Sequence, residues 1–319
     1  MSDNLITSRL IIKYPTMSST ARNWISCIPE CKWVENYFNW LNEQILHINL
    51  KQREQLIKRL VDQDDNKFYE AIAELVYIAF WNYLKLSFRK DPKIKDYTPD
   101  FEVFLDRKLK LSFLSDVTVV RHNHPHEKIV INGESIDKNT VKLKPVTAPI
   151  QQSHRILMKI VEKFKKYYKI LNNYHFVICL YKIGFENVFY LDDFQIRSAL
   201  FGDLKLSFKN GESWYEPSIQ TTVHNQQVCK GIFGFEEYKP LTAVITCDHE
   251  FYATSNTMLE KPKPHYPRKA RFSFSIYLNP LGEWSKGTDD PFSTSDIQVN
   301  RLIDENKLSF CDPKVIDFY

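Results

Sequence analysis

The chain has 319 residues, of which 43% are hydrophobic and 14% aromatic, a composition that is ample for a packed core and excludes global disorder. This length allows one large domain or two medium ones. The 43 basic and 39 acidic residues leave a net charge of +4, which permits a nucleic-acid partner without indicating one.

The cysteines and the first residues predict a reduced, soluble, cytoplasmic protein. Six cysteines are scattered along the chain, and Cys27 and Cys31 have no second close pair that would complete a zinc pattern. The beginning of the chain lacks the basic and apolar regions of a signal peptide. The most apolar helical stretch, residues 75–84, is too short to cross a bilayer and follows Glu74. We therefore expect no membrane partner.

The first 87 residues predict a mainly helical region. Residues 1–20 look irregular, with a short strand over 10–12, and apolar residues recur at helical spacing over 33–63. Asp64 opens a polar break that can cap the next helix. That helix, over 67–87, is apolar on most sides and should be buried.

Two paired strands carry the most informative residues of the chain. Residues 97–103 and 114–120 predict a hairpin, in which Asp100 opens the first strand after a proline. Side chains alternate along a strand, so Asp116 and Thr118 share one face. Two carboxylates that converge on one face repel each other, and a bound cation relieves this repulsion most simply.

The remaining elements complete a mixed α/β pattern. A polar excursion over 121–149 leads to a long helix over 150–171 with lysines on its outer side. Residues 176–180 form an almost continuous apolar run, as in a strand buried on both faces. The later elements are a short helix that ends at residue 201 and strands over 241–246 and 271–277.

This element order resembles the PD-(D/E)XK restriction-endonuclease-like superfamily. The likeness covers residues 67–181 in element order and acid spacing. It rests on the helix with Ala73-Glu74-Leu75, the strand opening Thr98-Pro99-Asp100-Phe101, the strand with Asp116-Val117-Thr118, and the helix–strand pair that follows.

The resemblance implies an α/β fold, with a restriction-endonuclease-like mixed sheet core flanked by helices. We expect an N-terminal helical extension over residues 1–66 and a nuclease-like core over 67–182. A β-rich C-terminal α+β addition over 183–319 would pack on the core.

The resemblance also implies a metal site. In that superfamily one acid on a helix and two on the hairpin bind one or two magnesium ions. Carried over by motif, these acids are Glu74, Asp100 and Asp116, and the cofactor is Mg²⁺ or Mn²⁺. A phosphodiester repels hydroxide, so its hydrolysis needs cationic help. Magnesium suits that task because it keeps coordination positions for water and phosphate oxygens.

The last position of the motif departs from the superfamily, because Thr118 stands where lysine is usual. Losing one preorganised stabiliser of this kind typically costs on the order of a hundred- to a thousandfold in rate. Some members place threonine here and take the cation from a nearby helix. Lys159 and Lys163, one turn apart on the 150–171 helix, are the candidates. The predicted catalytic set is therefore Asp100, Asp116, Thr118, Lys159 and Lys163.

Basic and amide side chains provide the candidate contacts to a nucleic acid, which we expect to be DNA. They lie on the long helix and in an exposed, lysine- and proline-rich loop over 261–271. The candidates are Gln151, Gln152, Arg155, Lys166, Lys263 and Arg268. The alternative for the lysine-rich helix face is a solvated surface. A homodimer and a subunit of a larger complex both remain open.

Each acidic candidate has a structural alternative. Asp100 and Asp116 could be surface acids on an exposed hairpin edge. Glu74 could form a buried salt bridge, since buried glutamates are rare unless they are paired or metal-bound. Glu70 shares a helix face with Glu74 and reads as an outer charge, and Glu102 as a spare ligand at best.

Two other patterns receive a structural interpretation. His122, His124 and His126 alternate in a way that could supply a zinc or manganese site, but their polar neighbours and a proline favour a solvated loop. Tyr167 and Tyr168 read as packing residues.

The sequence thus predicts a magnesium-dependent DNA endonuclease that hydrolyses phosphodiester bonds, with a role in defence or in a mobile element. A second class, which Thr118 favours, is a nuclease-derived scaffold that binds nucleic acid or a protein without cutting. A pathogen-secreted effector with unrelated chemistry is a third alternative.

Overall fold

The structure is a computed structural model. It describes residues 16–19, 21–22, 32–106, 111–120, 135–137, 140–141, 148–183, 193–209, 212–218, 220–223, 226–229, 231–251, 270–282, 284, 299–300, 302–304, 307–308 and 314–317. Over 148–155, and for the described residues within 203–229 and 299–317, among other stretches, it describes the backbone alone. The predicted strand over 10–12, the histidines at 122–126 and most of the 261–271 loop lie outside the described residues.

The helices are concentrated before the hairpin and directly after the polar excursion. The α-helices are α3 (Lys32–Ile45), α4 (Leu50–Leu60), α5 (Asp65–Tyr83), α6 (Ala148–Tyr167) and α7 (Asp193–Phe201). Short 3-10 helices are η2 (Tyr168–Asn173), η3 (Ile232–Gly234) and η4 (Glu236–Tyr238).

The strands fall into one large sheet and several two-stranded pairs. The large sheet contains β1 (Ser87–Lys90), β2 (Phe101–Asp106), β3 (Leu111–Val120), β6 (His175–Ile183), β11 (Leu241–Phe251), β12 (Ala270–Leu278), β13 (Val299–Asn300) and β16 (Lys314–Asp317). The pairs are β4 (Ser135–Asp137) with β5 (Thr140–Val141), β7 (Asp203–Lys209) with β8 (Glu212–Ser218), β9 (Gln220–Val223) with β10 (Gln226–Cys229), and β14 (Leu302–Asp304) with β15 (Lys307–Leu308).

The large sheet is mixed. Its main strands lie in the order β1-β2-β3-β6-β11-β12. The first three are antiparallel neighbours, β6 runs parallel to both β3 and β11, and β12 is antiparallel to β11. The strands predicted over 241–246 and 271–277 are therefore present, and both extend the sheet that holds the hairpin.

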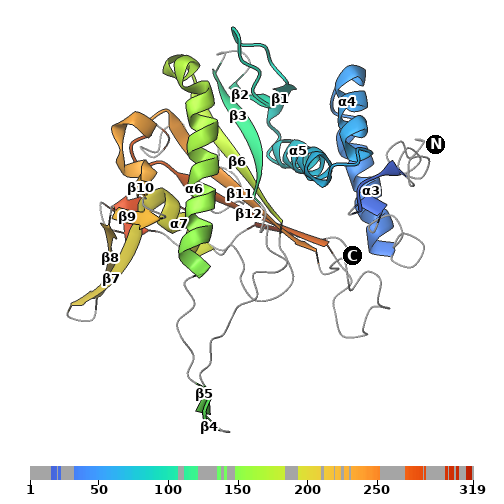
Figure 1. The fold of residues 1–319 in the computed structure, drawn as a ribbon. Helices are drawn as coiled ribbons and strands as arrows, with labels where there is room; N and C mark the ends of the chain where they lie inside the picture. The colour runs from blue at the N-terminus through green and yellow to red at the C-terminus, as the bar shows by residue number, and fades with distance from the viewer. Residues whose placement is uncertain are drawn as a thin grey trace.

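Helices cover both faces of this sheet (Figure 1). α5 packs on one face with α3 and α4 beside it, and α6 and α7 pack on the other. The position of strand β6 between the two helical layers explains the apolar run over 176–180. Its Val177, Cys179 and Tyr181 side chains belong to the α5 layer, and Ile178 and Leu180 to the α6 layer. The mixed α/β architecture flanked by helices is confirmed, while the predicted domain boundaries stay predictions.

Capping side chains determine where two of the N-terminal helices begin. Asn49 accepts a hydrogen bond from the Gln52 N–H at 3.0 Å, and Asp64 accepts one from the Asn66 N–H at 2.8 Å. The helical periodicity over 33–63 therefore belongs to two helices, and the predicted cap of the following helix is confirmed.

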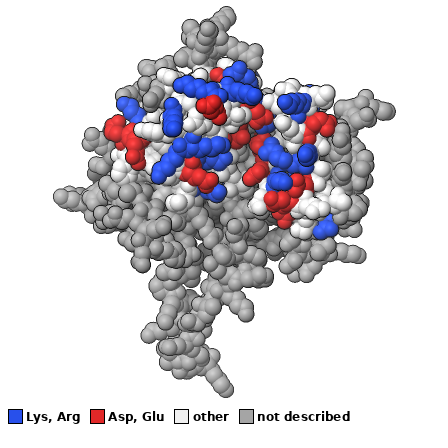
Figure 2. Space-filling view, turned by 45° about the horizontal axis from the view of Figure 1, so that its top comes forward, with Lys and Arg blue, Asp and Glu red and all other residues white. Residues whose placement is uncertain are grey.

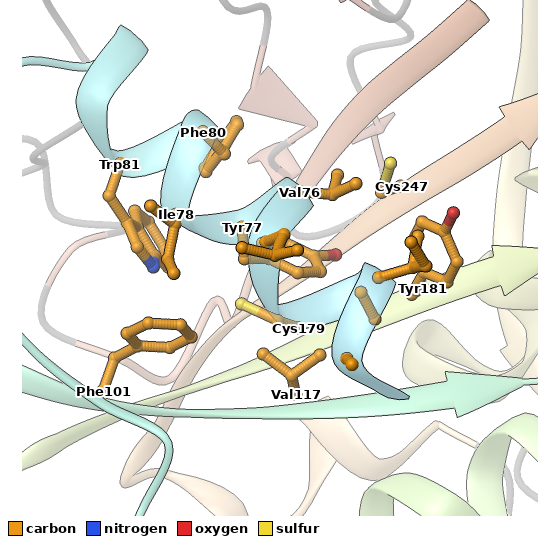
Figure 3. Packing of buried hydrophobic residues seen from close by; sticks show 14 of the residues in the cluster. Val76, Tyr77, Ile78, Phe80, Trp81, Phe101, Val117, Cys179, Tyr181 and Cys247 are labelled. Carbon is orange, nitrogen blue, oxygen red and sulfur yellow. The ribbon is translucent and has the colours of Figure 1, made fainter. Parts of the chain in front are cut away.

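Helix α5 is buried on nearly all sides, as predicted. Every residue from 71 to 81 is buried, because the sheet covers one side of the helix and α3 and α4 cover another. Figure 3 shows Tyr77 and Trp81 of α5 above Phe101, Val117 and Cys179 of the sheet. The one charged side chain within this buried run is Glu74.

Other sequence expectations have a clear outcome in the described parts of the chain. The helix predicted over 150–171 ends at residue 167 and continues as the 3-10 helix η2. Cys179 and Cys247 are buried free thiols. None of the described helices has the length and apolar character needed to cross a membrane.

Tyr77 ties α5 to two strands and provides a test of this packing. Its hydroxyl oxygen lies 2.9 Å from the carbonyl oxygen of Leu180 and 3.0 Å from that of Ile245. We expect Tyr77→Phe to lower the free energy of unfolding by about 1–2 kcal/mol, because these buried carbonyls lose a donor. Urea denaturation measures the change. Tyr168→Phe, at an exposed position, should cost less than about 0.5 kcal/mol; equal losses in the two variants would contradict this role.

Candidate functional site

The candidate site is a pocket at an open part of the sheet edge. Strand β2 begins at Phe101, opposite Ser115, whereas β3 continues to Val120. Residues 116–120 pair with β6 on one side, and no strand in the described ranges pairs with their other side. Side chains from both faces of the sheet can therefore reach the same place around this edge.

The pocket has a volume of about 690 Å³ and is lined from several elements. On one side of the sheet, α5 contributes three polar side chains and α4 contributes Arg59. On the other side, α6 contributes the residues between Met158 and Lys163 that line the pocket. The lining residues are Arg59, Asn66, Glu70, Glu74, Asp100, Val117, Thr118, Val119, Val120, Met158, Lys159, Glu162 and Lys163. Six residues that the sequence singled out are among them: Glu70, Glu74, Asp100, Thr118, Lys159 and Lys163.

Asp100 lies directly before β2 and faces the middle of β3. Its Oδ2 atom accepts a hydrogen bond from the Val117 N–H at 2.7 Å. Burial raises the pKa of Asp100 well above its ordinary value, and the nearby charges of Asp116 and Glu74 raise it further. Lys90 and the Val117 hydrogen bond oppose this shift without cancelling it. The two hairpin acids are thus brought together, and their crowding favours a proton on Asp100.

Asp116 is buried and held from α6 by two side chains. Its Oδ1 atom accepts a hydrogen bond from the Tyr167 hydroxyl at 2.8 Å. Its Oδ2 atom lies 2.6 Å from the Lys163 Nζ atom in an ion pair. Among the described residues Oδ2 has no further hydrogen-bond partner. Burial lowers the pKa of Lys163, but Asp116 outweighs it, so the pKa of this lysine is raised and the ammonium stays charged.

Glu74 is held by two cations of the α5 side. Arg59 binds its two oxygens in a bidentate manner at 2.6 and 2.7 Å, and Lys90 Nζ lies 2.5 Å from Oε2. Burial raises the pKa of Glu74, but these two cations lower it by more, so the carboxylate is ionised. The buried salt bridge that the sequence left open is therefore present. Metal ligation by Glu74 stays a prediction.

The remaining members of the predicted catalytic set line the same pocket. Thr118 is buried on β3, two residues beyond Asp116. Lys159 is exposed, one turn before Lys163, and its Nζ atom lies 3.3 Å from Glu162 Oε2. Glu70 is exposed, as an outer charge would be, yet it faces the pocket.

Glu102 has a structural role. It is buried and paired with Arg89, and its Oε1 atom accepts a hydrogen bond from the Ser112 hydroxyl at 3.2 Å. Its side chain does not line the pocket.

The predicted nucleic-acid contacts are only partly described. Lys166 is exposed, with its Nζ atom 4.6 Å from the centre of the Tyr167 ring. The backbone of α6 carries Gln151, Gln152 and Arg155 in its first two turns, without a description of their side chains. Lys263, Arg268, Cys27 and Cys31 lie outside the described residues.

Charges of both signs are mixed on the surface around α4 and α6. Figure 2 shows Lys and Arg side chains interspersed with Asp and Glu on this face, with no single continuous basic surface among the residues it colours. The pocket has the same balance. Among described residues that line it or pair with its lining, four are cationic (Arg59, Lys90, Lys159 and Lys163) and five are carboxylic (Glu70, Glu74, Asp100, Asp116 and Glu162). Cationic and carboxylic groups are therefore almost equal in number around the pocket.

Three residues of the site were not identified from the sequence as functional. Arg59 and Lys90 neutralise Glu74, and Tyr167, interpreted as a packing residue, also binds Asp116. A glutamate inside an apolar helix indicates that cationic partners exist, but it does not say where they stand in the chain. For Tyr167 the sequence contains no such indication, because its ring also packs in the core.

The donor atoms fit a hard divalent cation in part. Asp100 and Asp116 offer carboxylate oxygens, the ligands that Mg²⁺ prefers. Both oxygens of Glu74 are already bound by protein cations. Within the described ranges, no group of three or more His, Cys, Asp or Glu side chains is arranged to hold a metal ion. Asp100 and Asp116 are the other two acids of the predicted metal set, and both oxygens of Asp116 already contact Tyr167 or Lys163.

Comparisons with family models, with curated proteins and with solved structures found no match to this chain.

The raised pKa of Asp100 predicts a pH-dependent cost in stability. Below its ordinary value of 3.8 the carboxyl is protonated in both the folded and the unfolded chain, so it costs nothing. As the pH rises, the unfolded chain loses this proton first, so stability falls until the pH passes the folded-state pKa. We expect Asp100→Asn to raise the free energy of unfolding at pH 7, because the amide keeps an acceptor for Val117 without a charge.

Urea denaturation of wild type and Asp100→Asn at a series of pH values measures this difference. The gain should shrink toward zero as the pH approaches 3.8. Asp96→Asn, in the exposed part of the same loop, is the control for the exchange of an aspartate for an asparagine. A loss of stability in Asp100→Asn at every pH would show that the carboxylates are not crowded.

The buried ion pair of Glu74 and Lys90 predicts that substitutions at these two positions have strongly coupled effects on stability. We expect Glu74→Gln or Lys90→Met to lower the free energy of unfolding by about 3–5 kcal/mol, because each change removes one partner of a buried charge and leaves the other partners to balance it. The double variant should lose less than the two single variants together. A thermodynamic cycle from chemical denaturation measures this coupling, and strictly additive losses would contradict the pairing.

Proposed function

We propose that this chain is a metal-dependent nuclease of the PD-(D/E)XK kind that hydrolyses phosphodiester bonds in DNA. The observation that carries the proposal is the meeting of Asp100, Asp116 and Lys163 at the open edge of the sheet. Asp100 and Lys163 line the pocket, and Lys163 forms an ion pair with Asp116, which is buried on β3. This combination suits a reaction in which an anionic ester is attacked by water.

The order of elements around the pocket supports the proposed restriction-endonuclease-like core. Helix α5 precedes the β2–β3 hairpin, and α6 connects β3 to the parallel strand β6. The acids lie on α5, before β2 and within β3, in the order that the superfamily motif requires.

Asp100 and Asp116 would hold Mg²⁺ or Mn²⁺. When bound there, such an ion would acidify a water molecule and offset the charge on the attacked phosphate. The positive charge of the ion would attract the phosphodiester, and the open sheet edge beside residues 116–120 would leave room for a nucleic-acid strand.

Lys163 supplies the charge that Thr118 lacks. Its ammonium is charged, partly exposed and within reach of the two acids, so it can donate hydrogen bonds to phosphate oxygens. Thr118 can donate or accept a hydrogen bond at the same wall of the pocket. Lys159, one turn away, extends the positive edge toward flanking phosphates. Cytoplasmic location, DNA as the nucleic acid, and a dimer or larger complex stay predictions.

A second function is a non-cutting relative that binds nucleic acid or a protein. The observation that favours it is the double engagement of Glu74 by Arg59 and Lys90, which removes the third predicted donor from the pocket. In that case Asp116 and Lys163 would be a structural ion pair.

Calorimetric titration with Mn²⁺ followed by incubation with supercoiled plasmid separates the two functions. We expect wild type to bind Mn²⁺ and nick the plasmid. Asp116→Asn should lose binding and nicking. Lys163→Met should bind Mn²⁺ at least as tightly, because a competing cation is removed, yet nick about a hundredfold or more slowly.

Lys165→Met, at an exposed position on the same helix, is the matched control and should behave as wild type. Thermal unfolding of each variant checks that it is folded. Absence of both Mn²⁺ binding and nicking in wild type would favour the non-cutting function.

A further inference from the structure

Tyr167 connects the segment before β2, which carries Asp100, to strand β3, which carries Asp116. It is fully buried at the end of α6. Its hydroxyl oxygen lies 2.8 Å from Asp116 Oδ1 and 3.2 Å from the carbonyl oxygen of Thr98. Thr98 stands two residues before Asp100. The Tyr167 hydroxyl therefore lies between the backbone that precedes Asp100 and the side chain of Asp116.

The ring of Tyr167 is fixed by its surroundings. Its centroid lies 6.0 Å from that of Tyr97 and 5.4 Å from that of Phe176. The Lys166 ammonium lies 4.6 Å from the ring centre. The hydroxyl therefore has little freedom to follow a moving carboxylate. A rigid donor of this kind holds its acceptor in place.

Lys163 and Tyr167 stand one helical turn apart and share a face of α6. They take different oxygens of the same carboxylate, since Tyr167 binds Oδ1 and Lys163 lies 2.6 Å from Oδ2. The two contacts fix the rotation of the Asp116 carboxylate about its Cβ–Cγ bond. Of the two oxygens, Oδ2 is the one that contacts a cation, Lys163.

We propose that Tyr167 is a positioning residue that fixes Oδ1 of Asp116 and leaves Oδ2 as the oxygen that binds a cation. That cation is Lys163 in the metal-free chain and a divalent ion when one enters. This inference rests on the proposed function, in which Asp116 is a metal ligand. It adds a residue outside the superfamily motif, and it explains why a buried tyrosine directs its hydroxyl toward a carboxylate.

A first experiment tests the contact in the metal-free chain. Unfolding is measured for wild type, Tyr167→Phe, Asp116→Asn and the double variant. A hydrogen bond to a carboxylate should appear as a coupling of roughly tenfold or more in the unfolding equilibrium constant. Tyr168→Phe, one residue away and exposed, should show no coupling to Asp116→Asn. Zero coupling for Tyr167 would overturn the inference whether or not the chain binds metal.

A second experiment tests positioning by calorimetric titration with Mn²⁺. Tyr167→Phe should bind Mn²⁺ about 10- to 100-fold more weakly than wild type, as is typical when a group that orients a ligand is lost. Tyr168→Phe should bind as wild type. 4-Aminophenylalanine at position 167, which restores a donor on the same ring, should recover the affinity.

The two experiments separate the inference from the function on which it rests. Equal Mn²⁺ affinity of Tyr167→Phe and Tyr168→Phe would overturn the positioning role while leaving the nuclease proposal intact. If wild type takes up no Mn²⁺, the nuclease proposal fails, and the metal-free cycle alone decides whether Tyr167 holds Asp116. If Tyr167→Phe does not fold, the 4-aminophenylalanine variant is compared with wild type in both experiments. A lower Mn²⁺ affinity of that variant, or a loss of its coupling to Asp116→Asn, would overturn the inference.

Discussion

Two carboxylates held close together at a break in the sheet edge are the constraint on which the site depends. Asp100 lies directly before β2 and Asp116 lies on the neighbouring strand β3, and their mutual repulsion adds to the cost of burial. The pKa of Asp100 is raised as a result, and the ammonium of Lys163 balances the charge of Asp116. An arrangement that costs stability in the metal-free chain is typical of a binding or catalytic site, where function and stability are in conflict.

The N-terminal helices contribute to the site as well as to the core. Arg59 of α4 and Lys90 of β1 both form ion pairs with Glu74 of α5. The charge of a glutamate that would otherwise be unpaired in an apolar helix is balanced in this way. The helical region that precedes α5 therefore contributes Arg59 to the pocket, so its packing and the electrostatics of the site are linked.

The sequence predicted the elements better than it predicted their polar partners. Strand alternation and the apolar run of β6 were sufficient to predict the hairpin, the buried strand and the meeting of Asp100 with Asp116. The partners of Glu74 could not be predicted, because Arg59 and Lys90 approach it only after three elements have packed. The hydrogen bond from the Tyr167 hydroxyl to Asp116 could not be predicted for a related reason. The local sequence pattern indicates which face of a helix a residue occupies, but not where its polar atom points.

A crystal structure of the protein soaked in Mn²⁺ tests the central claim most directly. Anomalous scattering locates the ion without reference to any assumed mechanism. The account predicts an anomalous peak between the carboxylates of Asp100 and Asp116, with Lys163 turned toward the open pocket. Carboxylates that stay on their protein partners, with no peak between them or with manganese bound elsewhere, would contradict it.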